Sequence, residues 1–245
     1  MRRTGVIAVL GVLLTASVAW AQGTIATGKH DFSAGSALRN ADAAINGQTC
    51  VFCHTPHSGS TTVPLWNRNT PATAYQLYAS STMDATSPGA AAVQSSVSGA
   101  CLSCHDGTIG IDVLANLGGV SHTASVAFTA QGTANATYGT TGVPASANIM
   151  TGGAPFLGAD LRNDHPVTII YETARAATST EFVLQAISGS KVTVGAVNPL
   201  PLFGSATATA TVECASCHNP HNNTNGTFLR KSNAGSALCL TCHVK

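Results

Sequence analysis

Charged and aromatic side chains are scarce in this chain of 245 residues. Only 9% of the residues are charged and 5% are aromatic, while alanine, glycine, threonine and serine are abundant. The low charge argues against an ordinary disordered protein, because disordered chains combine low hydrophobicity with high net charge. The scarcity of large side chains argues against a strong core built by the protein alone. Composition therefore points to a bound apolar group as part of the core.

Basic clusters are also missing, which excludes a nucleic-acid partner because nothing is present to meet phosphates. Without Arg2 and Arg3, nine basic and ten acidic side chains remain. Residues 1–21 have the pattern of a secretory signal peptide, with a basic start, an apolar stretch and small residues ending at Ala21. The apolar stretch is too short to span a bilayer and no second one follows, so we expect no membrane span. A retained membrane anchor is the alternative. We expect a secreted protein that is extracellular or at the cell surface, or otherwise periplasmic.

Cysteine occurs only within four copies of the motif Cys-x-x-Cys-His, which is the signature for covalent attachment of c-type haem. The two thiols form thioethers with the porphyrin, and the histidine binds the iron. Zinc knuckles do not require a histidine after each cysteine pair, and a disulfide framework would not repeat this spacing. The sequence therefore predicts four haem c groups. The attachment residues are Cys50, Cys53, Cys101, Cys104, Cys214, Cys217, Cys239 and Cys242, and the proximal iron ligands are His54, His105, His218 and His243.

The four motifs form two pairs, and the leading motif of each pair is Cys-x-x-Cys-His-x-Pro-His. Such matching predicts a duplicated di-haem module. The expected organisation is a signal peptide at 1–21, a first di-haem module at 22–120 and a second at 213–245. Between the modules, residues 121–212 are expected to form a Thr/Ala/Gly-rich loop and a small β region.

Distal iron ligands are predicted from the remaining histidines. The second histidine of each leading motif, His57 or His221, cannot reach the far face of its own haem on so short a tether. We therefore predict that His57 binds the second iron and His221 the fourth. His30 and His165 each precede a module, and symmetry assigns them to the first and third irons. His122 is left over, either as a ligand or as a surface residue.

Nine histidines for eight axial positions predict that every iron is held by two imidazoles. Such iron has no open site for a substrate, so we expect an electron-transfer protein and not an enzyme. A monomeric periplasmic electron carrier is the alternative. A multihaem reductase of a small acceptor would need a vacant site, which a Cys-x-x-Cys-Lys variant often marks, and that variant is absent.

The predicted fold is a mostly irregular, loop-rich multihaem cytochrome c with a few short helices and a small β region, in which the haems form the core. We expect the chain to be largely unfolded without them. Helices are predicted at 37–45, 71–81, 90–105 and 236–243. Strands are predicted at 166–173, 181–185, 191–197 and 207–212 from β-branched alternation between glycine or proline borders.

The run from Cys50 to His57, the run from Cys101 to Thr108 and residues 163–167 resemble the outer-surface multihaem cytochromes of metal-reducing bacteria. The chain is most similar to the tetrahaem type that polymerises into extracellular filaments, the OmcE-type cytochrome nanowires. This resemblance implies haems ligated by two histidines, little regular secondary structure, and stacked haems alternating with T-shaped contacts. It also implies that copies of the chain are partners, with redox donor and acceptor proteins or extracellular acceptors. One distal histidine would come from the adjacent subunit, and His30 and His122 are the candidates in this chain.

Overall fold

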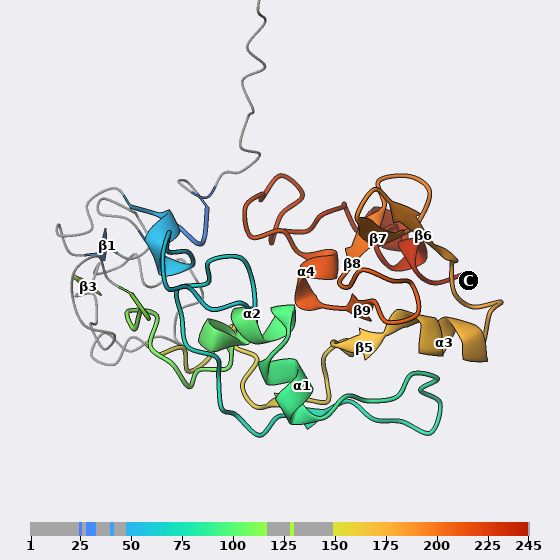
Figure 1. Cartoon of the computed structure of the whole chain (residues 1–245), viewed down its shortest axis with the longest axis horizontal. Coiled ribbons are helices and arrows are strands. Elements are labelled where there is room, and N and C mark those ends of the chain that lie inside the picture. The colour runs from blue at the N-terminus through green and yellow to red at the C-terminus, as the bar shows by residue number, and fades with distance from the viewer. Residues whose placement is uncertain are drawn as a thin grey trace, which may run out of the picture.

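The structure is a computed structural model that describes residues 25, 28–32, 40–41, 48–116, 128–129 and 149–244. The expected signal peptide, His122 and most of the expected helix at 37–45 lie outside the described residues. Within them, short helices and strands are joined by long irregular connections (Figure 1). This agrees with the loop-rich architecture that the sequence predicts.

The longest described helix, α2, has nine residues. None of the described helices has the length and apolar character needed to cross a membrane. The α-helices are α1 (Ala90–Gln94), α2 (Val97–His105), α3 (Tyr171–Ala177) and α4 (Cys214–Cys217), and the 3-10 helices are η3 (Cys50–Phe52), η5 (Ala234–Ser236) and η6 (Cys239–Thr241).

The described strands form four small sheets. The largest is antiparallel with the order β6-β7-β8, and the other sheets are the antiparallel pairs β1-β3 and β5-β9 and the parallel pair β2-β4. The strands are β1 (Asn40–Ala41), β2 (Gln76–Leu77), β3 (Phe128–Thr129), β4 (Asp160–Leu161), β5 (Ile169–Ile170), β6 (Gln185–Ser188), β7 (Lys191–Val194), β8 (Leu200–Leu202) and β9 (Thr211–Val212).

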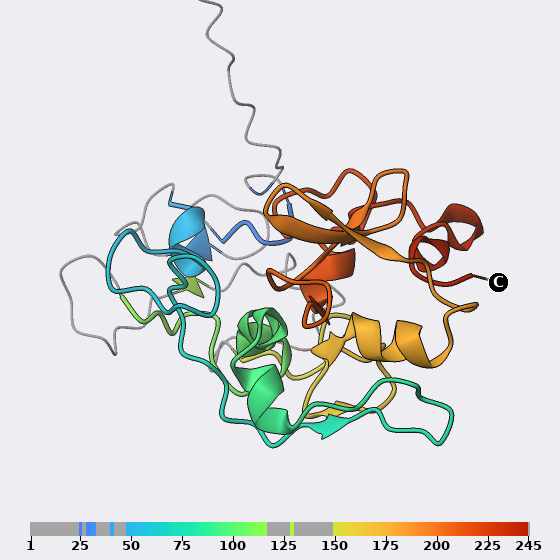
Figure 2. The same ribbon diagram turned by 45° about the vertical axis from the view of Figure 1, so that its right-hand side comes forward.

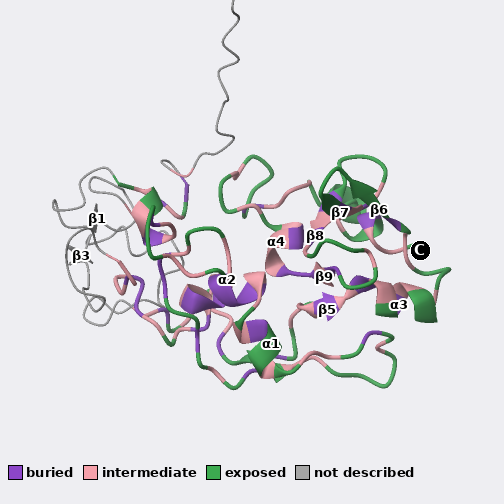
Figure 3. Cartoon of the chain, in the orientation of Figure 1, coloured by how far each residue is buried: buried purple, intermediate pink, exposed green. Residues whose placement is uncertain are grey.

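Buried apolar side chains of the described residues form three separate clusters instead of one core. The largest joins β7 and β8 to β5, β9 and α3. A second contains Phe52 and Leu114, and a third places Val93 and Leu102 of the two central helices together. Buried residues are correspondingly frequent in α2, β7 and β8, whereas β6 is mostly exposed (Figure 3).

The predicted helix at 71–81 is wrong, because the chain is extended there. Gln76 pairs with Asp160 in the parallel ladder between β2 and β4. Tyr75, 6% exposed, is buried in the cluster that also contains Leu161. Tertiary packing of the aromatic and aliphatic side chains therefore overrides the local helical preference of residues 71–81.

The predicted helix at 90–105 forms as two helices, α1 and α2. The break occurs where Ser96 caps α2 by accepting a hydrogen bond from the Gly99 backbone N–H. Gly99 also allows the two helices to approach closely, since a Cβ there would lie 2.3 Å from the Gln94 carbonyl oxygen. The second haem motif ends α2 as predicted.

The other predicted elements are partly correct. Residues 191–194 form β7 as expected, and only the end of the predicted strand at 181–185 is extended, as the start of β6. The predicted strand at 166–173 contains β5 but turns into α3 at Tyr171. The single helix expected at 236–243 is replaced by two short 3-10 turns.

Candidate haem-binding sites

Each Cys-x-x-Cys-His motif lies on a single helical turn. Cysteines three positions apart share one side of a helix, so both thiols of each motif face the same way. In three motifs the backbone N–H of the histidine donates to the carbonyl oxygen of the first cysteine. The distances are 2.8 Å for His54, 2.9 Å for His218 and 2.9 Å for His243. In the remaining motif, which is the second along the chain, His105 is the last residue of α2. All four motifs therefore present two thiols and an imidazole from one turn.

All eight cysteines lie in the described part of the chain and are free thiols. Thiols of successive motifs are neighbours. The side chains of Cys101 and Cys214 lie next to each other where α2 packs against α4. The motif-bearing helices η3, α2, α4 and η6 consequently follow one another across the molecule in chain order (Figures 1 and 2).

The pKa values of the cysteine thiols also indicate that successive motifs are neighbours. Burial raises the pKa of Cys53 to about 12, and the neighbouring Cys104 adds to the shift. Burial also raises the pKa of Cys242 to about 12, with Cys217 as the next cause. The first motif is therefore close to the second, and the third is close to the fourth.

Six histidines lie in three close pairs. The ring centres of His54 and His221 are 6.1 Å apart, with an angle of 22° between the planes. Those of His30 and His105 are 6.1 Å apart at 75°, and those of His165 and His243 are 6.4 Å apart at 66°. These neighbours differ from the symmetric scheme expected from the sequence, in which His221, His30 and His165 served the fourth, first and third irons. For His221 and His30 the difference arises because residues 220–228 lie against His54 and His30 of the first module.

Backbone carbonyls hold the proximal rings. Nδ1 of His54 donates to the Pro64 carbonyl oxygen at 2.9 Å, and Nδ1 of His105 donates to that of Pro155 at 2.7 Å. A hydrogen bond at Nδ1 fixes the tautomer and leaves Nε2 free to bind a metal.

The same anchoring recurs in two more histidines. Nδ1 of His218 donates to the Thr227 carbonyl oxygen at 2.9 Å, and Nδ1 of His165 donates to that of Pro166 at 2.9 Å. Each of these rings also keeps Nε2 for a metal.

His30 is held by residues of the second module. Its ring stacks on Phe228 with 4.4 Å between ring centres and 7° between the planes, and it hydrogen-bonds to the backbone of Pro220. Loss of contact with water and the nearby His105 lower the pKa of His30 to about 4. The ring is therefore neutral at physiological pH, which is the form that binds metals.

The paired rings fit a haem iron between them. With roughly 2 Å from metal to nitrogen and about 1 Å from nitrogen to ring centre, two axial imidazoles have centres roughly 6 Å apart. The three measured separations agree with this value. Near His54 lies the indole of Trp66, whose Nε1 is buried and has no hydrogen-bond partner among the described residues. This donor suits an acceptor such as a haem propionate. The residues therefore fit bound haem.

The chain segments after the two leading motifs fold alike. In the first, Thr55 N–H donates to the Leu65 carbonyl oxygen at 2.8 Å. In the second, Asn219 N–H donates to that of Phe228 at 2.7 Å. Leu65 and Phe228 both have a positive φ, of 57° and 59°. The repeat predicted from the cysteine motifs thus extends to the conformation of the following loops, although these loops differ in sequence.

Two predicted ligands lie apart from the three pairs. His57 is exposed, directly after the first leading motif. His218 is near His105, whose pKa it lowers after the larger effect of burial. His122 is outside the described residues, so its role stays a prediction.

Sequence reasoning missed two buried charged residues between the motifs. Arg68 is 1% exposed and donates to the carbonyl oxygens of Gly110, Ile111 and Ser103 at 2.7, 2.9 and 3.3 Å. Glu213 is 2% exposed and directly precedes Cys214. No motif marks either residue, since both depend on contacts between segments far apart in the sequence.

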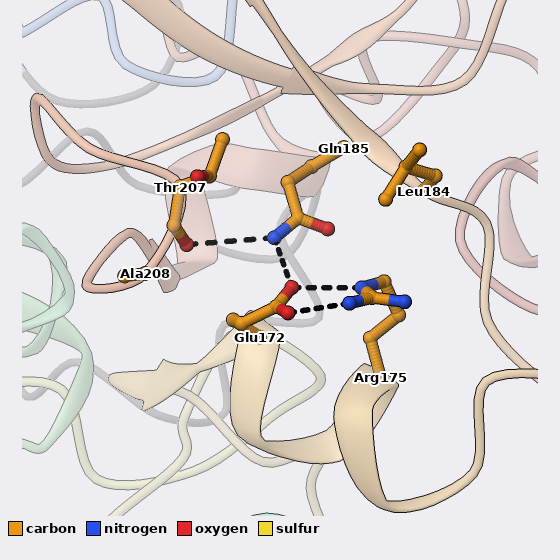
Figure 4. A pocket seen from close by; sticks show the side chains of 6 residues that line it. All are labelled: Glu172, Arg175, Leu184, Gln185, Thr207 and Ala208. Carbon is orange, nitrogen blue, oxygen red and sulfur yellow. Dashed lines mark hydrogen bonds and ion pairs between the residues drawn. The ribbon is translucent and has the colours of Figure 1, made fainter.

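A shallow pocket lies away from the haem motifs. Figure 4 shows Glu172 accepting two hydrogen bonds from Arg175, at 2.7 and 2.5 Å, and one from Gln185. Its other lining residues are Leu184, Thr207 and Ala208. It includes none of the motif cysteines or histidines, so it is not the site of haem attachment.

Comparison with known protein families gives one match, over residues 207–245, to the family described as the doubled CXXCH motif. The match includes the third and fourth motifs. No curated protein matches the chain. The C-terminal part therefore carries the paired motif of multihaem c-type cytochromes, and such motifs imply covalently bound haem c.

Proposed function

We propose that this protein is a secreted four-haem c-type cytochrome that transfers electrons and is not an enzyme. The observation that carries the proposal is the arrangement of the four motifs. They occur in succession, and thiols of neighbouring motifs lie close together from the first to the fourth. Groups attached to these thiols would form one continuous row.

The residues of the chain hold and orient this row. Haem supplies an iron that gains and loses one electron when it is bound. The eight cysteines fix the porphyrins, and the carbonyls of Pro64, Pro155 and Thr227 fix the proximal rings. Rings fixed in this way keep their orientation when the iron changes its charge. Two imidazoles on each iron leave no place for a substrate, which favours electron transfer over catalysis.

Haem content and spin state test this proposal. Mass spectrometry of the exported protein should give four haems per chain, and the optical and EPR spectra should show low-spin iron throughout. Fewer than four haems would contradict the count. A native high-spin haem that binds nitrite or a similar small ligand would support a reductase instead.

The proposal includes assembly into extracellular filaments. Cys50 and Cys239 belong to the two outer motifs and are both exposed, so each end of the row is near the surface. Head-to-tail contact between copies would continue the row, and such a contact gives a filament when it does not close into a ring. Negative-stain microscopy of the cell-surface fraction tests this. Fibres that bind an antibody against the chain are expected, and a monomer without fibres on cells would leave a soluble periplasmic carrier.

A further inference from the structure

We propose that the two modules are joined by iron ligation, with His221 of the second module binding the iron that Cys50, Cys53 and His54 hold. In the same scheme His30 binds the iron of the second motif and His165 that of the fourth. This inference rests on the proposed haem content and goes beyond it by assigning ligands. It replaces the expectation that each leading motif supplies a ligand to its own module.

The surroundings of His221 support the assignment. Its ring centre is 6.1 Å from that of His54, which matches two imidazoles on one iron. The fourth proximal ligand, His243, instead has His165 beside it at 6.4 Å. His221 therefore faces the first iron and not the fourth.

The surroundings of His30 give a second link between the modules. The His30 ring is stacked on Phe228 and bonded to the backbone of Pro220, both in the second module. Its ring centre is nevertheless 6.1 Å from that of His105 in the first module. The second module thus positions the ligand of a first-module iron. His218 takes part in none of the three pairs, so His57 and His122 remain for its iron.

Plane angles give each pair a spectroscopic signature. Axial imidazoles with nearly parallel planes give a rhombic low-spin EPR signal, whereas nearly perpendicular planes give a signal dominated by one very large g value. Among the three pairs of described histidines, His54 and His221 are nearly parallel, at 22°. The other pairs lie at 75° and 66°.

The test replaces His221 with Ala in the holoprotein and in a variant without the fourth haem, made by Cys239→Ala and Cys242→Ala. We expect one haem per chain to become high-spin in both backgrounds, with loss of the rhombic signal. If the new high-spin haem is seen only when the fourth haem is present, His221 binds the fourth iron and the proposal is wrong. The comparison variant, His57→Ala, should keep the rhombic signal, because His57 is a candidate ligand of the third iron and not of the first.

His221→Met is a second test for the case in which the His221→Ala variant does not fold. His221→Met keeps a possible ligand, so one haem should gain the near-infrared band of histidine–methionine ligation and a higher reduction potential. That band should persist without the fourth haem and disappear when Cys50 and Cys53 are replaced by Ala. Persistence after loss of the first haem would overturn the assignment. Haem content measured on the same samples separates this result from failure of the proposed function.

Discussion

Glu213 accepts hydrogen bonds from both the backbone N–H and the hydroxyl of Ser98, across the contact between α4 and α2. Its carboxylate also accepts from Thr168 at 3.1 Å and Thr211 at 2.7 Å. Because Cys214 follows directly and its side chain adjoins that of Cys101, this carboxylate fixes the second motif against the third.

Replacement of Glu213 with Gln should therefore destabilise the holoprotein. A buried amide nitrogen cannot accept the hydrogen bonds that the carboxylate oxygen accepts, which should cost about 1–3 kcal/mol. Urea unfolding followed by circular dichroism measures the loss. Glu181→Gln at an exposed position is the matched control, with an expected change within about 0.5 kcal/mol. Equal effects of both variants would show that Glu213 has no special structural role.

Loss of the Glu213 charge should also raise the reduction potentials of nearby haems. A buried negative charge stabilises oxidised iron, and the low dielectric of the interior strengthens the effect. Potentiometric titration followed in the α-band measures this shift. Ser98→Ala, which removes two hydrogen bonds and no charge, should leave the potentials nearly unchanged.

Arg68→Met should lower the stability of the protein more than the similar size of the two side chains suggests. The guanidinium satisfies carbonyl oxygens of Ser103, Gly110 and Ile111 in a buried site, and methionine would leave them without donors. We expect a loss of at least about 2 kcal/mol in the free energy of unfolding. Arg162→Met is the control, since the side chain of Arg162 is 61% exposed. A loss no larger than that of the control would contradict the role assigned to Arg68.

Gly195 should not tolerate a side chain. Its φ is +91°, and a Cβ would lie 2.5 Å from Cγ2 of Thr241 in η6, the turn that carries the fourth motif. Gly195→Ala should therefore combine backbone strain with displacement of this turn, and cost about 1–3 kcal/mol more than strain alone.

Gly189→Ala is the matched control for this glycine. Gly189 has a φ of +61° and open space around its Cα, so alanine there meets backbone strain only. Thermal unfolding of both variants separates the two effects. If both variants lowered the melting temperature equally, η6 would move to accommodate the Cβ at position 195 without further loss of stability.

Stability should fall in acid through Glu172. Hydrogen bonds from Arg175 and then Gln185 lower the pKa of Glu172 from 4.5 to about 2. Because the folded pKa is depressed, the contribution is fully present above about pH 4.5 and is lost as the pH falls towards 2. The pair is partly exposed, so its contribution should not exceed about 1 kcal/mol.

Comparison of the wild type with Glu172→Gln between pH 7 and 3 measures this effect. The difference in unfolding free energy should be constant at neutral pH and shrink in acid. A difference that grows in acid would show that the carboxylate does not stabilise the fold in its ionised form.

The sequence predicted well those features that depend on local spacing. Helices were predicted over the second and fourth motifs, and a helical turn is present at each of the four motifs. The sequence also predicted a loop-rich fold with a few short helices and a small β region. These features follow from composition and from residues a few positions apart.

Features that depend on distant contacts were not predicted. The neighbours of His221 and His30 follow from how the second module packs against the first, and symmetry between the modules does not reveal that packing. The strand at Gln76 likewise needs its partner at Asp160. Arg68 and Glu213 carry no local signal, because each is bonded to segments far away along the chain.

The closeness of His54 and His221 also bears on the order of synthesis. His54 is made early and His221 near the end of the sequence, so their contact forms only when most of the chain is available. Contacts between such distant residues form slowly, because a long loop must close first. Under the proposed ligation, completion of the first site is therefore tied to synthesis of the segment after the third motif, and a chain that ends before His221 would leave the first site unfinished.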